Sequence, residues 1–221
     1  MTEKLSGQQV LDADLTDWRL MLRSLHARFA TGDFATGLEL AGRIGTAAEE
    51  LNHHPDLDLR YRHLDVRLTS HDTGAVTGRD VDLARRISAA AAELGVSAAP
   101  AQVSFLELAL DTADHSAIKP FWRAVLGYED HPSSGDEIDD PGAARPTIWF
   151  QGTEAHDAPR QRWHLDVWVP HDVAEQRVAD AVAAGGSLVS AAQAPSYWVL
   201  ADGDGNKACV CTWQSRNGAT S

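Results

Sequence analysis

Hydrophobic and polar residues recur with clear periods along the first hundred residues. Apolar side chains stand near every second position of residues 18–29, which predicts two short strands. In residues 34–51 they recur every three or four positions, which is typical of a core-facing helix. Alternation returns at residues 64–68, and Thr77, with an aspartate three residues on, begins a second helical stripe that ends near residue 94. This order predicts an α+β unit with helices on one face of an antiparallel sheet.

The second half shows a pattern that occurs twice. Residues 103–110 predict a strand, residues 117–126 a short helix and residues 146–150 another strand. A strand, a helix and further strands then follow between residues 163 and 213, so we expect a duplicated α+β domain. A small, polar, proline-bearing segment at residues 95–102 separates the two patterns. We therefore expect one domain over residues 1–98 and a second over residues 99–221.

Composition restricts the partners of this chain of 221 residues. Its formal net charge is −13, so nucleic acid is an unsuitable direct partner, because binding phosphates requires a basic face. The N-terminus leads into no apolar run, and no stretch reaches the length of a membrane span, so we expect neither a secretory leader nor a membrane partner. Two cysteines, Cys209 and Cys211, are poorly spaced for a disulfide, which favours a cytoplasmic location.

The most informative residues are three histidines within nineteen positions. His53 and His54 precede Pro55, where the helix must stop, and His71 follows the strand at residues 64–68. The unperturbed pKa of histidine lets the side chain donate and accept protons near neutral pH. The cluster therefore predicts proton-transfer chemistry.

Two carboxylates accompany the histidines. Glu49 lies one helical turn before His53 and could share its face, and Asp72 could orient His71 or raise its pKa. Two other interpretations remain open. The histidines could be polar caps that close a helix and a turn, or they could form a zinc site, although their spacing is unusual for zinc and no cysteine is near in the sequence.

Three runs around the histidines resemble the pterin-4a-carbinolamine dehydratases: AEELNHHPD at residues 48–56, VRLTSHDTG at 66–74 and TGRDVDLA at 77–84. The resemblance extends over about residues 18–94. It implies dehydration of 4a-hydroxytetrahydrobiopterin or a related 4a-carbinolamine to the quinonoid dihydropterin, without a metal or redox cofactor. It also implies that the chain self-associates into a homo-oligomer.

The same resemblance assigns roles to individual residues. It makes His53 and His71 the acid/base pair, without deciding which is the acid. His54 binds and orients the pterin, and Glu49 assists. Pro55 and Asp72 are expected to contact the substrate. The chain departs from the family pattern at residues 75–76 and 57, where we expect changes in turn shape and pocket lining.

Residues 103–213 resemble the glyoxalase/bleomycin-resistance group, which has the vicinal oxygen chelate fold of duplicated βαβββ modules. The resemblance rests on LALDTAD at 108–114, FWRAVLG at 121–127, WHLDV at 163–167 and ADGDGN at 201–206. Metal-binding members would place ligands at Glu107, His164, Gln151 and Cys209. In this chain Glu107 and His164 remain as metal-ligand candidates, but they are weak ones, because a cysteine stands where a glutamate is expected. We therefore expect a metal-free domain, with a divalent metal as the less favoured alternative.

These observations support one main hypothesis and two alternatives. The main one is a cytoplasmic hydro-lyase that acts on a small pterin and carries a glyoxalase-like domain of unknown ligand. The first alternative is a metal-dependent glyoxalase- or dioxygenase-type enzyme in which the dehydratase-like domain serves assembly. The second is a non-enzymatic protein that binds a small molecule or serves as an interaction partner.

Overall fold

The computed structural model describes residues 3–132, 134–155, 163–201 and 207–215, apart from the side chains of residues 121, 124, 125 and 164. Its internal contacts divide the chain into two compact units, Met1–Val103 and Ser104–Ser221. The linker expected at residues 95–102 ends just before this division. Among the described helices, none is long and apolar enough to cross a membrane.

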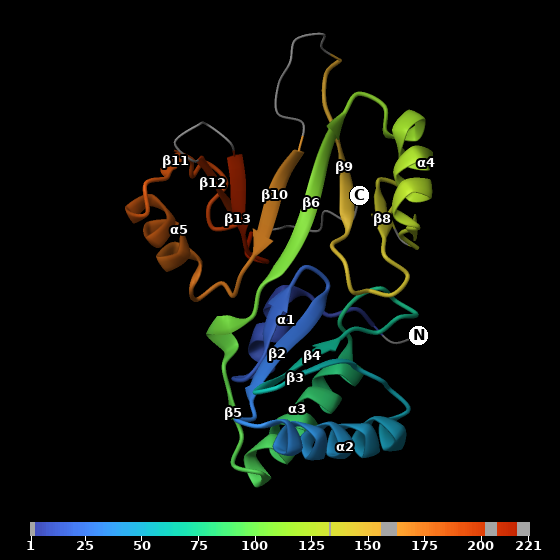
Figure 1. Cartoon of the computed structure of the whole chain (residues 1–221), viewed down its shortest axis with the longest axis vertical. Helices are drawn as coiled ribbons and strands as arrows, with labels where there is room; N and C mark the ends of the chain where they lie inside the picture. Colours follow the sequence, from blue (N-terminus) through green and yellow to red (C-terminus); the bar gives the residue numbers. More distant parts are fainter. Residues whose placement is uncertain (1–2, 133, 156–162, 202–206, 216–221) are drawn as a thin grey trace. The chain divides into compact units, whose positions relative to one another are not determined.

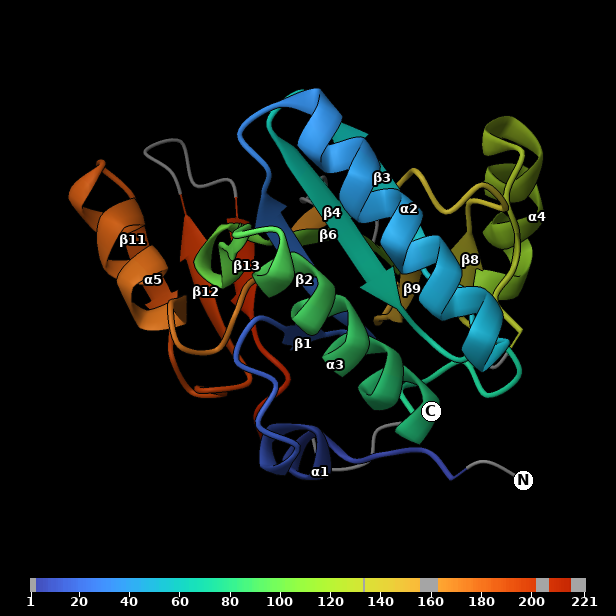
Figure 2. The same ribbon diagram turned by 90° about the horizontal axis from the view of Figure 1, so that it is seen from below.

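The first unit is an antiparallel sheet with two long helices on one face (Figures 1 and 2). Strands follow the order β1-β2-β4-β3, and β5 pairs with β2. The elements in chain order are α1 Gly7–Asp12, β1 Arg19–Met21, β2 Ser24–Ala30, α2 Phe34–Leu51, β3 Asp56–Arg60, β4 His63–Leu68, α3 Gly78–Glu93, β5 Ser97–Ala98 and the 3₁₀ turn η1 Pro100–Gln102. The predicted fold class is confirmed, but α1, β3 and β5 were not predicted.

The core of the first unit lies between the sheet and the helices. In β2, Leu25, Ala27 and Phe29 are buried and alternate with more exposed residues. They pack with the apolar stripes of α2 and α3, represented by Ile44 and Ile87, which are fully buried. Figure 2 shows α2 and α3 lying side by side across the strands.

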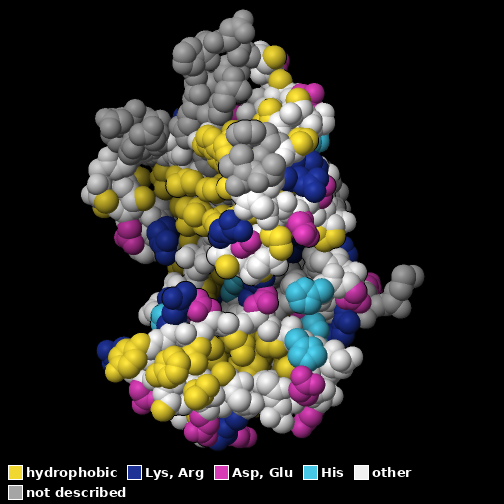
Figure 3. Space-filling view, turned by 45° about the vertical axis from the view of Figure 1, so that its right-hand side comes forward, with side chains coloured by type: hydrophobic (Ala, Val, Ile, Leu, Met, Phe, Trp, Pro, Cys, Tyr) yellow, Lys and Arg dark blue, Asp and Glu magenta, His cyan; other side chains and the backbone are white. Residues whose placement is uncertain are grey.

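Strand β3 was missed because it lies at the edge of the sheet and is mostly exposed. Its Leu57 is 39% exposed, so the alternation of leucine with aspartate does not mark a buried face. Phe34 and Leu38 of α2 and Tyr61 after β3 are also exposed. Hydrophobic side chains cover part of this unit in the lower half of Figure 3.

The second unit is one eight-stranded sheet built from two modules of the same βαβββ order (Figure 1). The first module comprises β6 Phe105–Thr112, α4 His115–Leu126, β7 Glu129–Asp130, β8 Glu137–Asp139 and β9 Ile148–Gly152. The second comprises β10 Trp163–Trp168, α5 Ala174–Ala183, β11 Ser187–Ser190, β12 Tyr197–Ala201 and β13 Lys207–Cys211. The predicted duplication is confirmed, although the residue pattern did not locate the short strands β7 and β8 that the βαβββ order implies.

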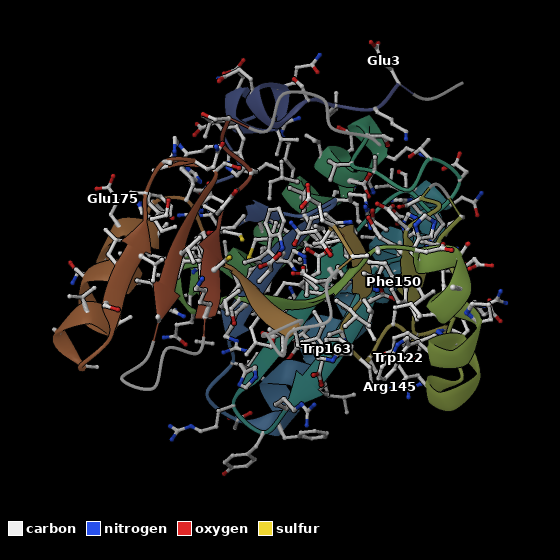
Figure 4. All side chains as sticks on the ribbon, turned by 90° about the horizontal axis from the view of Figure 1, so that it is seen from above. Glu3, Trp122, Arg145, Phe150, Trp163 and Glu175 are labelled. Atoms are coloured by element: carbon white, nitrogen blue, oxygen red, sulfur yellow. The ribbon has the colours of Figure 1, made fainter. Side chains whose placement is uncertain are left out.

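Pairing in the central strands shows how the modules join. The first and last strands of each module pair in parallel, β6 with β9 and β10 with β13. The two first strands, β6 and β10, pair antiparallel in the middle of the sheet. Beside α4, the rings of Trp122 and Trp163 meet edge to face with centroids 5.2 Å apart, and Phe150 is buried in the same cluster (Figure 4). α5 packs on β11, β12 and β13 of its own module, whereas α4 packs on β9 of its own module and, through Trp122, also meets Trp163 of β10 in the other module.

A pair of glycines in α2 tests the packing of this helix. A Cβ built at Gly37 would lie 2.6 Å from Leu59 Cδ1 of β3, whereas one at Gly45 would meet no atom within 4 Å. Gly45→Ala should stabilise the protein by about 0.5–1 kcal/mol, because alanine favours helix. Gly37→Ala should be less stable than Gly45→Ala by about 1–3 kcal/mol, because Leu59 must move. Urea unfolding measures both, and equal stabilities would contradict the packing described here.

Candidate active site

At the C-terminal end of α2, two adjacent histidine side chains lie in different environments. Asn52 follows the helix with φ 47° and ψ 45°, a left-handed conformation that asparagine tolerates better than most residues. The His53 N–H donates to the Ala48 carbonyl over 3.0 Å, which closes the helix end. The helix thus ends at Leu51, and the left-handed turn at Asn52, rather than Pro55, ends it. As a result the His53 side chain is 6% exposed and the His54 side chain 55% exposed.

A buried aspartate holds the His53 ring. His53 Nε2 lies 2.7 Å from Oδ1 of Asp80, whose side chain has no solvent exposure. Because a carboxylate only accepts hydrogen bonds, Nε2 carries the proton of this bond. Among the described residues, the structure gives the other ring nitrogen, Nδ1, no hydrogen-bond partner. The ring is thus oriented through one nitrogen, and the other can serve chemistry.

Two further donors hold Asp80, one in the segment after β4 and one at the N-cap of its own helix α3. Its Oδ2 accepts from the Ser70 hydroxyl over 2.7 Å and from the Thr77 N–H over 2.7 Å. The second bond belongs to the capping box that starts α3, where the helix dipole favours a negative charge. The carboxylate therefore joins the end of α2, the segment after β4 and the start of α3.

His54 and Glu49 form a separate, exposed pair. His54 Nε2 lies 3.1 Å from Glu49 Oε1, and the Glu49 side chain is 81% exposed. The expectation that Glu49 shares the face of His53 was wrong, because the left-handed Asn52 turns His53 inward and leaves His54 beside the helix end. In the lower half of Figure 3, histidine side chains lie beside acidic ones.

His71 is exposed in a tight turn after β4. The Ser70 N–H donates to the Ala75 carbonyl over 3.1 Å, and the Gly74 N–H donates to the Ser70 carbonyl over 2.9 Å. Ser70, the residue before His71, donates to Asp80, which also binds the His53 ring. The turn thus brings the backbone of His71 close to the His53–Asp80 pair.

Asp72 does not orient His71 as expected. Its Oδ1 accepts a hydrogen bond from the guanidinium of Arg79 in the first turn of α3. This bond is the main cause that holds the pKa of Asp72 below its usual range, and the nearby His53 adds a smaller attraction.

Sequence reasoning missed four residues of this site: Ser70, Thr77, Arg79 and Asp80. Asp80 was recognised only as a helix cap, three residues after Thr77. Aspartate at that position is explained by capping alone, so nothing in the pattern indicates its bond to a histidine 27 residues earlier. Pro55 follows the two histidines and is partly buried, as a turn residue can be.

The candidate metal positions of the second unit are only partly assembled. Glu107 of β6 is buried directly opposite Asp166 of β10, and Asp166 is in turn opposite Cys209 of β13. The indole N–H of Trp168 donates to Glu107 Oε2 over 3.4 Å. Gln151 lies in β9, opposite Asp111.

His164 is in register with Ala109, but its side chain lies outside the described residues. Among the side chains that are described, no three of the His, Cys, Asp and Glu type come together as a metal site. The donor set therefore offers two buried carboxylates and a thiol in one row across the sheet, without a described histidine.

Comparison with known proteins agrees with this two-part architecture. The family model for pterin 4 alpha carbinolamine dehydratase matches residues 2–90, and a glyoxalase-like domain model matches residues 107–211. A protein of Nocardia farcinica, provisionally named pterin-4-alpha-carbinolamine dehydratase, is 40% identical over 88 residues, which are 39% of this chain and 93% of that protein. One of Rhodopseudomonas palustris with the same provisional name is 38% identical over 102 residues, 44% of this chain and all of that protein.

Solved structures resemble each unit in turn. A transcriptional coactivator/pterin dehydratase from Brucella melitensis is 29% identical, with a TM-score of 0.39, and the match covers 40% of this chain and 99% of that one. A glyoxalase/bleomycin resistance protein/dioxygenase superfamily member from Vibrio splendidus is 17% identical, with a TM-score of 0.34, and the match covers 50% of this chain and 99% of that one.

The two family models, with the duplicated βαβββ order of the second sheet, define a dehydratase-type domain followed by a glyoxalase-like domain of the vicinal oxygen chelate fold. Through its first unit, the chain belongs to the pterin-4-alpha-carbinolamine dehydratase family. Both resemblances noted in the sequence are confirmed.

The Asp80 network can be tested by stability. Asp80→Ala should lower the free energy of unfolding by about 3–5 kcal/mol. The substitution removes the acceptor of three buried donors, on His53, Ser70 and Thr77. Asp82→Ala, in the same helix, is the matched control, since the Asp82 side chain is 69% exposed. It should change stability by less than about 0.5 kcal/mol. Urea unfolding with equal losses in both variants would contradict the role given to Asp80.

Proposed function

We propose that the first unit dehydrates a 4a-hydroxytetrahydropterin, such as 4a-hydroxytetrahydrobiopterin, to the quinonoid dihydropterin by histidine acid/base catalysis. The observation that carries this proposal is the buried His53 ring, oriented by Asp80 beside the turn that bears His71. Family membership supports the substrate class, since the relatives in the comparison are named for pterin-4-alpha-carbinolamine.

The reaction requires two proton transfers and no change of oxidation state. A proton delivered to the C4a hydroxyl lets the C–O bond break, and water leaves with the electron pair of that bond. The proton on N5 is removed, and its N–H electrons form the C4a=N5 double bond. One proton enters and one leaves, so an acid and a base at fixed positions are sufficient.

In this proposal His53 and His71 supply the acid and the base. Asp80 keeps the proton of His53 on Nε2, so that Nδ1 faces the reacting groups. His54, paired with Glu49 at the exposed edge of the site, binds and orients the pterin. Pro55 directly follows His53 and His54, and Asp72 directly follows His71.

The histidines can be tested with freshly generated 4a-hydroxytetrahydropterin, whose dehydration is followed by absorbance. His53→Ala and His71→Ala should each lower kcat/KM by about 10²- to 10⁴-fold, the range expected for loss of a general acid or base. His63→Ala is the control, because His63 lies on β4 and faces Asp65 at 3.8 Å.

Folding of each variant is checked by circular dichroism. Wild-type protein that does not accelerate dehydration would refute the proposed function. Full activity in both His53→Ala and His71→Ala would refute the mechanism.

A further inference from the structure

The position of Arg79 is not explained by any gain in the stability of α3. It lies in the first turn of α3, two residues after the N-cap Thr77, where the helix dipole disfavours a positive charge. Its Nε is buried and, within the described part of the chain, has no hydrogen-bond partner. Both features destabilise the folded state, and an unsatisfied buried donor calls for a physical reason.

The guanidinium reaches from the helix to the turn that carries His71. It donates to Asp72 Oδ1, and Asp72 directly follows His71. At the base, the turn is closed by the bond between Ser70 and Ala75. Near its tip, the Thr73 hydroxyl donates to the carbonyls of Ser70 and Ala75, both within the turn. The Arg79–Asp72 ion pair is thus the link that ties the tip to α3.

His71 consequently lies between two tethers that end on the same helix. On one side, Ser70 bonds to Asp80, which also holds His53. On the other side, Asp72 bonds to Arg79, the residue before Asp80. A turn fixed at both flanks presents its middle residue in a narrow range of positions, and small displacements of a catalytic group reduce rates strongly.

We propose that Arg79 is a positioning residue which, acting through Asp72, holds His71 in place beside His53. This inference rests on the proposed function. An exposed ion pair by itself contributes little to stability, so the effect of removing this one should be seen in the rate of reaction.

A double-mutant cycle tests the link. Arg79→Ala and Asp72→Ala should each lower kcat by about 10- to 100-fold with little change in KM, because the group displaced acts in the transition state. The double variant should lose no more than either single variant, since both remove the same tether. Arg79→Lys, which keeps the charge, should recover part of the loss.

Arg43→Ala is the matched control. The Arg43 side chain is 37% exposed against 36% for Arg79, and it forms ion pairs with Glu39 and Glu93 away from the turn. Its kcat should equal that of the wild type. If Asp72→Ala fails to fold, Asp72→Asn removes the charge at nearly constant shape.

Several results would overturn the inference. Full kcat in Arg79→Ala would do so, and losses that multiply in the double variant would show that Arg79 acts by another route. A rise in KM alone would indicate direct contact with the substrate. These outcomes presuppose active wild-type protein, whereas an inactive wild type overturns the proposed function together with the inference.

Discussion

One buried carboxylate organises the candidate site. Asp80 accepts hydrogen bonds from the His53 ring, the Ser70 hydroxyl and the Thr77 amide, which come from three separate segments of the chain. A buried carboxylate is stable only if such donors surround it. The same requirement that makes Asp80 compatible with the core therefore orients the histidine and places the turn that follows β4.

The periodic part of the fold was predictable from the sequence. Residues 34–51 show a helical stripe and form α2 over the same residues, because Ile44 and Ala48 of that stripe are buried. The stripe was wrong at its start, where Phe34 and Leu38 are exposed and Gly37 and Leu40 are buried instead. The repeated pattern after residue 103 likewise corresponds to two modules of one sheet. Elements that bury little surface were missed: α1 has one buried residue, and β3 lies at an edge. Pattern reasoning detects burial, and these elements have little of it.

The residue types of the site were easier to predict than its contacts. The histidines stood out because their spacing next to a proline is unusual and family motifs surround them. The hydrogen-bond partners of the histidines did not stand out in this way. Glu49 bonds to His54 and not to the His53 face, and Asp72 bonds to Arg79. Which carboxylate meets which base depends on the left-handed backbone at Asn52 and on the packing of α3, and neither can be read from local spacing.

The two modules of the second domain meet at the seam between β6 and β10. Within the described strands, the two modules are hydrogen-bonded to each other only through this antiparallel pair. Unzipping it would leave the bonds inside each module intact but expose two long sheet edges. Such edges readily accept a new strand. The backbone ladder between β6 and β10, with the Trp122–Trp163 and Trp168–Glu107 contacts across it, therefore keeps these two edges covered and the two halves together.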